Sequence, residues 1–180
     1  MSKKVLIISS SLRGGSNSEC LARECERGAK DAGHDVQFIS LKGKELKFCI
    51  GCLSCQETGK CVLKDDAADI MAAVYNAEVI VFATPIYYYE MCGQMKTLLD
   101  RLNPLYTSDY RFRKVCMIAT AAEDSDSAFE KAYNGLLGWV DCFEKAELCG
   151  LVAGGGIGDS GDAKHHAEAL CRAYELGKAL

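Results

Sequence analysis

The chain has 180 residues, of which 49% are hydrophobic and 26% charged, a composition that excludes a disordered protein. Its net charge of -4 argues against a nucleic-acid partner, which favours a basic face. No apolar run approaches the roughly 20 residues that cross a bilayer, and the N-terminus lacks a signal-peptide pattern. With 11 cysteines, these features predict one domain over residues 1–180, located in a reducing cytoplasm.

Apolar runs rich in β-formers alternate with helical patterns along the chain. The predicted strands are Val5–Ile8, Val36–Ile39, Val79–Ala83, Lys114–Thr120 and Glu147–Ala153. The predicted helices run from about 17 to 32, onward from 65, and over 92–101, 127–142 and 163–180. Apolar strands that alternate with helices predict an α/β fold with a doubly wound parallel sheet.

A C-x2-C-x2-C-x5-C run occupies the loop at 47–64, between the second strand and the next helix; its cysteines are Cys49, Cys52, Cys55 and Cys61. Four thiolates from one short loop suit a metal ion or an iron–sulfur cluster. The first three cysteines have the spacing of ferredoxin-type [4Fe–4S] loops, although Val62 stands where those loops have Pro. Zinc and unmetallated redox-active thiols remain alternatives. The remaining cysteines are predicted to be small buried hydrophobes: Cys20, Cys25, Cys92, Cys116, Cys142, Cys149 and Cys171.

Ligands of an open parallel sheet lie beyond the carboxyl ends of its strands. The loop that follows the first strand lacks both the dinucleotide fingerprint and the Walker pattern. It offers hydroxyls, an amide and a guanidinium just before a helix N-terminus, where backbone N–H groups and the helix dipole favour a phosphate. A serine- and glycine-rich turn with a helix cap is the alternative. The candidate residues are Ser9, Ser11, Arg13, Ser16, Asn17 and Ser18.

Two further loops leave the carboxyl ends of neighbouring strands, at residues 84–91 and 120–126. The first places Tyr87, Tyr88 and Tyr89 after Pro85, and such aromatics stack on a planar ring or form a subunit contact. Taken alone, three tyrosines are more often an interface. Beside a phosphate loop they indicate a mononucleotide with a flat heterocycle.

The whole chain resembles the flavodoxin-like NADPH-dependent FMN reductase family, and within it the iron–sulfur flavoprotein branch. The family's first loop reads roughly G-S-P-R-x-G-x-N-T, and residues 10–18 follow it except that Ser10 and Leu12 stand at its Gly and Pro positions. The family's T-P-I-Y signature and its G-Q-M-K-x-x-x-D-R run match residues 84–88 and 93–101. The cysteine spacing equals the compact motif of the branch.

This resemblance implies a flavodoxin-like, three-layer α/β/α domain whose five-stranded sheet has the order 2-1-3-4-5. It implies FMN as the cofactor, NAD(P)H as a possible electron donor and a possible [4Fe–4S] cluster on the four loop cysteines. No side chain is assigned as a catalytic acid or base. The flavin ring is assigned to Pro85, Ile86, Tyr87, Tyr88, Thr120 and Ala121.

Three functions follow from these patterns. The first is an oxidoreductase or electron-transfer protein that couples FMN to a cluster and serves a redox partner or a small-molecule acceptor. The second is an NAD(P)H-dependent FMN or quinone reductase without a cluster. The third is a zinc-stabilised, non-catalytic interaction domain. For the first two, the three consecutive tyrosines offer more aromatic surface than one flavin ring can cover, and with the family resemblance this predicts a homodimer or homotetramer.

Overall fold

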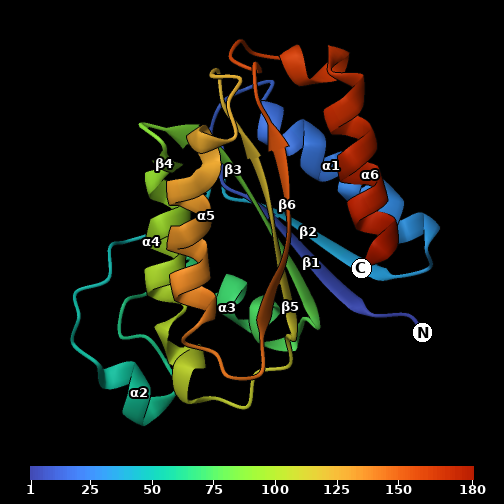
Figure 1. The fold of residues 1–180 in the computed structure, drawn as a ribbon. Helices are drawn as coiled ribbons and strands as arrows, with labels where there is room; N and C mark the ends of the chain where they lie inside the picture. Colours follow the sequence, from blue (N-terminus) through green and yellow to red (C-terminus); the bar gives the residue numbers. More distant parts are fainter.

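A computed structural model describes residues 1–180, and its sheet has five parallel strands in the order β2-β1-β3-β5-β6 (Figure 1). A two-residue strand, β4 (Glu90–Met91), pairs antiparallel with the end of β3. Apart from β4, the order is the predicted 2-1-3-4-5, so the predicted flavodoxin-like fold class is confirmed. The parallel strands are β1 (Lys4–Ser9), β2 (Asp35–Ser40), β3 (Val79–Tyr87), β5 (Lys114–Thr120) and β6 (Glu147–Gly154).

Helices cover both faces of the sheet (Figure 1). One face carries α1 (Asn17–Asp31) and α6 (Ala167–Ala179). The other carries α3 (Ala67–Asn76), α4 (Gly93–Arg101) and α5 (Ser127–Val140). A short helix, α2 (Ser54–Thr58), lies within the cysteine run, and two 3-10 turns complete the chain, η1 (Asn103–Thr107) and η2 (Asp162–His165). None of these helices combines the length and the apolar character that crossing a bilayer requires.

The prediction of one continuous helix over 163–180 is wrong. The segment divides into η2 and α6, and His166 separates them with non-helical backbone angles. The imidazole Nδ1 of His166 accepts a hydrogen bond from the backbone N–H of Ala169 at 3.2 Å. His166 therefore caps the N-terminus of α6, where backbone N–H groups otherwise lack partners.

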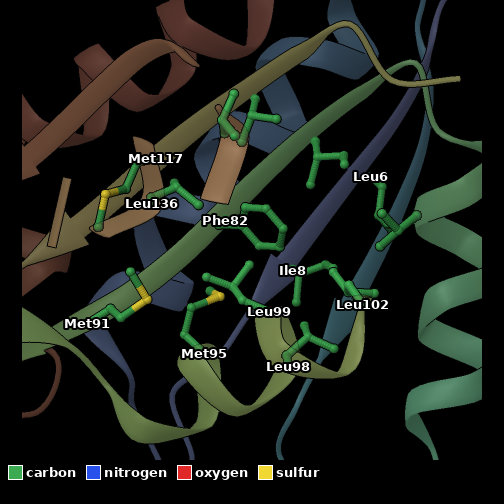
Figure 2. Close-up of a cluster of buried hydrophobic side chains, with 14 of the residues drawn as sticks. Leu6, Ile8, Phe82, Met91, Met95, Leu98, Leu99, Leu102, Met117 and Leu136 are labelled. Carbon is green, nitrogen blue, oxygen red and sulfur yellow. The ribbon is translucent and has the colours of Figure 1, made fainter. Parts of the chain in front are cut away.

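The strands read as continuous apolar runs because both of their faces are buried. Leu6 and Ile8 of β1 point with Phe82 of β3 toward α4 and α5, and Figure 2 shows them packed against the leucines and methionines of that layer. Val5 and Ile7, one position out of phase, point toward α1 and α6. Two hydrophobic cores, one on each face of the sheet, hold the three layers together.

Helices α1 and α6 touch backbone to backbone. A Cβ atom at Gly28 would lie 2.0 Å from the carbonyl oxygen of Tyr174, and one at Gly177 would lie 2.0 Å from the carbonyl oxygen of Cys25. Neither distance is possible for a real side chain, so both positions require glycine. The close packing fixes α1, and with it the helix N-terminus that follows the first strand.

Candidate functional site

Three loops converge on one pocket at the carboxyl ends of β1, β3 and β5, which we call the sheet-edge pocket. Its volume is about 180 Å³. The nominated cofactor residues line it, except for Ser9 and Tyr88. The lining residues are Ser11, Arg13, Ser16, Asn17, Ser18, Pro85, Ile86, Tyr87, Thr120, Ala121, Ala122, Ile157 and Gly158.

The N-terminus of α1 opens into this pocket. The hydroxyl of Ser16 accepts a hydrogen bond from the backbone N–H of Glu19 at 3.1 Å and lies 3.3 Å from the hydroxyl of Ser18. This cap satisfies one backbone donor of the first turn and leaves the others directed at the pocket. The positive end of the dipole of a 15-residue helix adds to their attraction for an anion.

Arg13 supplies a cation at the rim of the same pocket. Its guanidinium donates a hydrogen bond to the carbonyl oxygen of Gly158 at 3.0 Å, and the pair is exposed. Its backbone N–H points at the hydroxyl of Ser11, 3.4 Å away. Hydroxyls, backbone N–H groups and a guanidinium are the donors that bind phosphate, so the residues present fit the phosphate of FMN.

Asn17 has a structural role that the sequence did not reveal. Its side-chain amide donates to the carbonyl oxygen of Asp159 at 2.7 Å. Its side-chain oxygen accepts from the backbone N–H groups of Gly161 at 3.1 Å and of Ala163 at 3.2 Å. The side chain therefore holds the segment after β6 against the pocket, which explains how Ile157 and Gly158 come to line it.

A tight turn shapes the aromatic side of the pocket. Ile86 pairs with Met91 and Tyr87 with Glu90, so Tyr88 and Tyr89 form a two-residue hairpin turn. Both have positive φ, 52° and 65°, as a type I′ turn requires and as a β-carbon disfavours. Tyr87 stays at the pocket, whereas the turn directs Tyr88 outward with 99% of its surface exposed.

Tyr89 connects this turn to the loop after β5. Its hydroxyl donates a hydrogen bond to a carboxylate oxygen of Glu123 at 2.7 Å, which raises the pKa of Tyr89. Behind the turn, the backbone N–H of Cys92 donates to the hydroxyl of Thr84 at 3.1 Å, and its thiol lies 3.1 Å from the hydroxyl of Ser10. The three loops of the pocket are thus linked to one another by hydrogen bonds.

A second and larger pocket, the cysteine pocket, has a volume of about 450 Å³. All four cysteines of the run line it, together with apolar side chains from the ends of α4 and α5. A fifth cysteine, Cys142, also lines it, and the sequence offered no signal for this. Its lining residues are Cys49, Ile50, Gly51, Cys52, Leu53, Cys55, Cys61, Val62, Leu63, Leu99, Asp100, Asn103, Tyr106, Trp139, Cys142 and Phe143.

The donor set of the cysteine pocket contains the four thiols that a [4Fe–4S] cluster requires. No three side chains of the kinds that bind metals stand close enough together to hold one ion. A [4Fe–4S] cluster spreads its four thiolates around a larger body and is compatible with four cysteines on the walls of one cavity. The backbone N–H and the hydroxyl of Ser54 lower the pKa of the Cys52 thiol, which favours the thiolate that a metal needs.

Two cysteines of the run, Cys55 and Cys61, contact polar side chains at the end of α4 and the start of η1. Cys55 is buried, and its sulfur accepts a hydrogen bond from the side-chain amide of Asn103 at 3.1 Å. Arg101 lies beside Cys61. The hydrogen bond to Asp65 is the main cause of the raised pKa of Arg101, and Cys61 adds a smaller contribution in the same direction. The buried Nε of Arg101 has no hydrogen-bond partner. A donor left free beside a thiol suits a thiolate that carries a cluster.

A buried ion pair closes the base of the cysteine loop. Arg101 donates to both carboxylate oxygens of Asp65, at 2.5 and 2.9 Å, and both side chains are fully buried. The same guanidinium donates to the carbonyl oxygen of Lys47 at 2.7 Å, so it joins the two ends of the loop. Burial raises the pKa of Asp65, but hydrogen bonds from Arg101 and from the backbone N–H groups of Lys47 and Ala67 outweigh it and lower the pKa.

The two pockets lie at opposite ends of the sheet. The sheet-edge pocket is at the carboxyl ends of the strands, whereas the cysteine pocket contains the last residues of α4 and α5. These helices run antiparallel to the strands, and Figure 1 shows α2 at the bottom of the molecule, far from the tips of β5 and β6 at the top. Electron transfer between the two sites of one chain would have to cross the protein.

The fold is that of a flavodoxin-like α/β protein, and its sheet-edge pocket, lined by hydroxyls, an amide and a guanidinium, lies where such folds bind their ligands. The sequence pattern of the NADPH-dependent FMN reductase family matches residues 3–138, and the chain belongs to this family.

Several relatives carry iron–sulfur names. An iron-sulfur flavoprotein of Methanocaldococcus jannaschii is 40% identical over 102 residues, which are 57% of this chain and 53% of that protein. An iron-sulfur flavoprotein of Methanosarcina thermophila is 26% identical over 76% of this chain and 72% of its own length. The matches with the M. jannaschii protein and an iron-sulfur flavoprotein of Archaeoglobus fulgidus span 53% and 46% of those proteins, about half their length.

Among solved structures, an NAD(P)H:quinone oxidoreductase from Methanothermobacter marburgensis superimposes with a TM-score of 0.77, covering 99% of this chain and 96% of that one. The two share 17% sequence identity. An azoreductase from Bacillus anthracis superimposes with a TM-score of 0.74 at 16% identity and covers the whole of both chains. At these identities the likeness establishes the fold.

Proposed function

We propose that this protein is an FMN-dependent oxidoreductase that transfers electrons between FMN in the sheet-edge pocket and a [4Fe–4S] cluster held by Cys49, Cys52, Cys55 and Cys61. The observation that carries the proposal is the pairing of two pockets in one chain, a phosphate cradle at the sheet edge and a cavity lined by four thiols. Membership of the FMN reductase family and the names of the relatives support it.

Bound FMN would supply the redox chemistry by accepting a hydride from NAD(P)H and releasing its electrons singly or in pairs. The chain binds and orients it. Hydroxyls, the α1 N-terminus and Arg13 hold the phosphate end, and Pro85, Ile86, Tyr87, Thr120 and Ala121 lie where the ring would sit. We assign no side chain as an acid or base, because hydride transfer needs positioning rather than proton abstraction.

The cofactor-binding role of Ser9 and Tyr88 stays a prediction. Ser9 lies at the end of β1, fully buried, and its hydroxyl has no hydrogen-bond partner. Tyr88 projects away from its own pocket. We infer that Tyr88 contacts a second copy of the chain, in a homodimer or homotetramer.

A dimer or tetramer would also bring the cysteine pocket of one subunit near the FMN site of another, which the separation of the two pockets within one chain requires. Since the cysteine pocket lies at the far end of the sheet from the FMN site of its own chain, electrons would pass between a cluster and the FMN of a neighbouring subunit. The exposed apolar side chains of the cysteine loop, Phe48, Ile50, Leu53 and Val62, suit burial against such a neighbour. We place the protein in the cytoplasm, because 11 cysteines favour a reducing compartment.

Cys55→Ser tests the cluster assignment. Serine keeps an oxygen that can accept from Asn103 but is a poor iron ligand, so anaerobically purified Cys55→Ser should lose its iron and the broad brown absorbance while retaining FMN. Cys171→Ser, at an exposed thiol of α6, is the matched control and should keep both. Full iron in Cys55→Ser would refute the ligand assignment.

The second candidate is an NAD(P)H-dependent FMN or quinone reductase whose cysteines carry no cluster. The name of the M. marburgensis structure favours it. Anaerobic absorbance separates the two, since this candidate gives only the structured flavin bands.

The flavin released by heat should be FMN, because the chain offers one phosphate cradle. A release of mostly FAD would contradict both candidates. A zinc-stabilised interaction domain would show neither the flavin bands nor the brown absorbance of a cluster, and the family membership argues against it.

A further inference from the structure

Two cysteines outside both pockets meet across neighbouring strands. The register of β5 and β6 shifts between Val115 and Cys116: Val115 pairs with Leu148, and Cys116 pairs with Gly150. Cys149 is therefore the extra residue of a β-bulge. In a regular strand, the side chain before Gly150 would point to the opposite face, but a bulge turns both of its residues toward the same one.

The bulge brings the thiol of Cys149 to 2.7 Å from the thiol of Cys116. A disulfide bond is about 2.05 Å long, so the two sulfur atoms need to approach by only about 0.7 Å more to become bonded. Bulges are rare between parallel strands and recur where a side chain must be re-aimed. The sequence predicted both residues to be small buried hydrophobes. For Cys149 that prediction is wrong, as it is for Cys142 and Cys171, because all three are exposed.

The two thiols differ in accessibility. Cys116 is fully buried on the α1 and α6 face of the sheet, beside Cys25. Cys149 lies on β6, the edge strand, and solvent reaches it. One thiol can therefore meet a dissolved reagent, while its partner can react only with the first.

The thiols also differ in acidity. The hydrogen bond from Cys116 lowers the pKa of Cys149 to about 7, against its own desolvation; Lys114 contributes in the same direction and Glu147 opposes it. The same bond, together with burial, raises the pKa of Cys116. The exposed sulfur is thus the one that carries the thiolate, the reactive form of a cysteine.

We propose that Cys116 and Cys149 form a redox-active dithiol that hydroperoxides oxidise to a disulfide across β5 and β6. The sulfur of Cys149 attacks one oxygen of hydrogen peroxide, the O–O bond breaks, and water forms as Cys149 becomes a sulfenic acid. The sulfur of Cys116 then attacks that of Cys149, the S–O bond breaks, and hydroxide leaves with the proton of Cys116 as a second water. Two thiols and one peroxide give one disulfide and two waters.

Peptide mapping tests the proposal directly, because trypsin isolates the two cysteines. Cleavage after Lys114, Lys131, Lys145 and Lys164 yields the peptides 115–131 and 146–164, each with a single cysteine. The anaerobic holoprotein is treated with one to a few equivalents of hydrogen peroxide, alkylated and digested without reductant. The linked pair 115–131 with 146–164 should be the main new species involving either peptide, and dithiothreitol should abolish it.

Variants separate the dithiol from general thiol oxidation. In Cys116→Ala the oxidation of Cys149 should stop at the sulfenic acid, trapped by dimedone, or proceed to the sulfinic acid. Cys149→Ser should leave Cys116 unmodified. Because it replaces an exposed residue, this variant still tests the proposal if Cys116→Ala does not fold. Cys171→Ser is the matched exposed control and should form the linked pair as the wild type does. A wild-type map without that pair, or with Cys149 joined to a different cysteine, would overturn the proposal.

Discussion

The sheet-edge pocket and the cysteine pocket are built in different ways. The loops around the first are bonded to one another: Ala121 donates to Gly154 and accepts from Ile157, at 3.0 and 2.9 Å, and the side chain of Ser160 donates to Gly14 at 2.9 Å. The loop that forms the second is fastened firmly at its ends, by Arg101 and Asp65. Between these ends it makes few bonds to the rest of the chain.

The side chains of the two regions differ in the same way. The floor of the sheet-edge pocket is polar and buried, whereas the cysteine loop exposes Phe48, Ile50, Leu53 and Val62. Exposed apolar side chains contribute no hydrophobic stabilisation until another surface or a ligand buries them. The first pocket is therefore preorganised for its ligand by the protein alone. The second leaves apolar side chains in water, so we expect its bound ligand and a neighbouring surface to stabilise it further.

The largest expected effect comes from the base of the cysteine loop. Arg101→Ala leaves the Asp65 carboxylate buried without its partner, which costs about 3–5 kcal/mol of unfolding free energy. It also releases both ends of the loop, so the iron content should fall sharply while FMN is retained. Urea unfolding, iron analysis and flavin absorbance measure the three quantities on one preparation.

An exposed ion pair on the same helix provides the control. Lys96 and Asp100 are 2.7 Å apart at the surface of α4, and Lys96→Ala should cost less than about 1 kcal/mol. Because the pKa of Asp65 is lowered in the folded state, its stabilisation is present at neutral pH and is lost as the pH falls through the carboxyl range. If Arg101→Ala left stability and iron unchanged, the loop would be held by something other than the ion pair.

Asn17→Ala probes the preorganised pocket. The substitution leaves the N–H groups of Gly161 and Ala163 without their acceptor, at about 1–3 kcal/mol for each donor, so we expect a loss of about 2–6 kcal/mol in total. FMN should bind more weakly because the segment after β6 is no longer held, whereas iron should stay. Asn76→Ala removes an exposed amide at the end of α3 and should change neither. Unchanged stability of Asn17→Ala would show that the other hydrogen bonds of the segment, to Arg13, Ala121 and Gly14, hold it without Asn17.

The difference between the pockets also explains what the sequence could predict. The convergence of the loops after β1, β3 and β5 follows from parallel strands alone, because their carboxyl ends share one edge. The segment at 157–158 was missed, because it is held at the pocket by long-range hydrogen bonds with Asn17, Arg13 and Ala121, which no local sequence pattern indicates. Cys142 and Trp139 were missed because nothing local indicates that the end of α5 lies over the cysteine loop. The bulge at Cys149 depends on strand register, which only the assembled sheet determines.

A smaller effect is expected at the rim of the sheet-edge pocket. We propose that Arg13 gives the FMN phosphate a charge-assisted hydrogen bond, so Arg13→Ala should lower the affinity for FMN by about 1.5–3 kcal/mol while the apoprotein keeps its stability. Flavin titration followed by fluorescence measures the affinity. Arg23→Ala removes the same charge from an exposed position on α1 outside the pocket and should bind FMN normally. Equal affinity in the two variants would mean that Arg13 serves only its bond to Gly158.

The smallest effect on folding is expected at the hairpin turn, where the comparison extends to assembly. Tyr88 holds a positive φ with its ring almost fully in water, so the isolated chain gains little from the side chain. Asparagine tolerates this backbone conformation, and Tyr88→Asn should therefore change unfolding free energy by no more than about 0.5 kcal/mol. Self-association, measured by light scattering across a concentration series, should nevertheless weaken, because the variant lacks the aromatic ring that we propose contacts the second copy. Tyr75→Asn, at a partly exposed ring on α3, should leave association unchanged. A monomeric wild type, or an undiminished dimer in Tyr88→Asn, would show that the turn is not the subunit contact. The cysteine loop would then not be buried in an interface that Tyr88 forms.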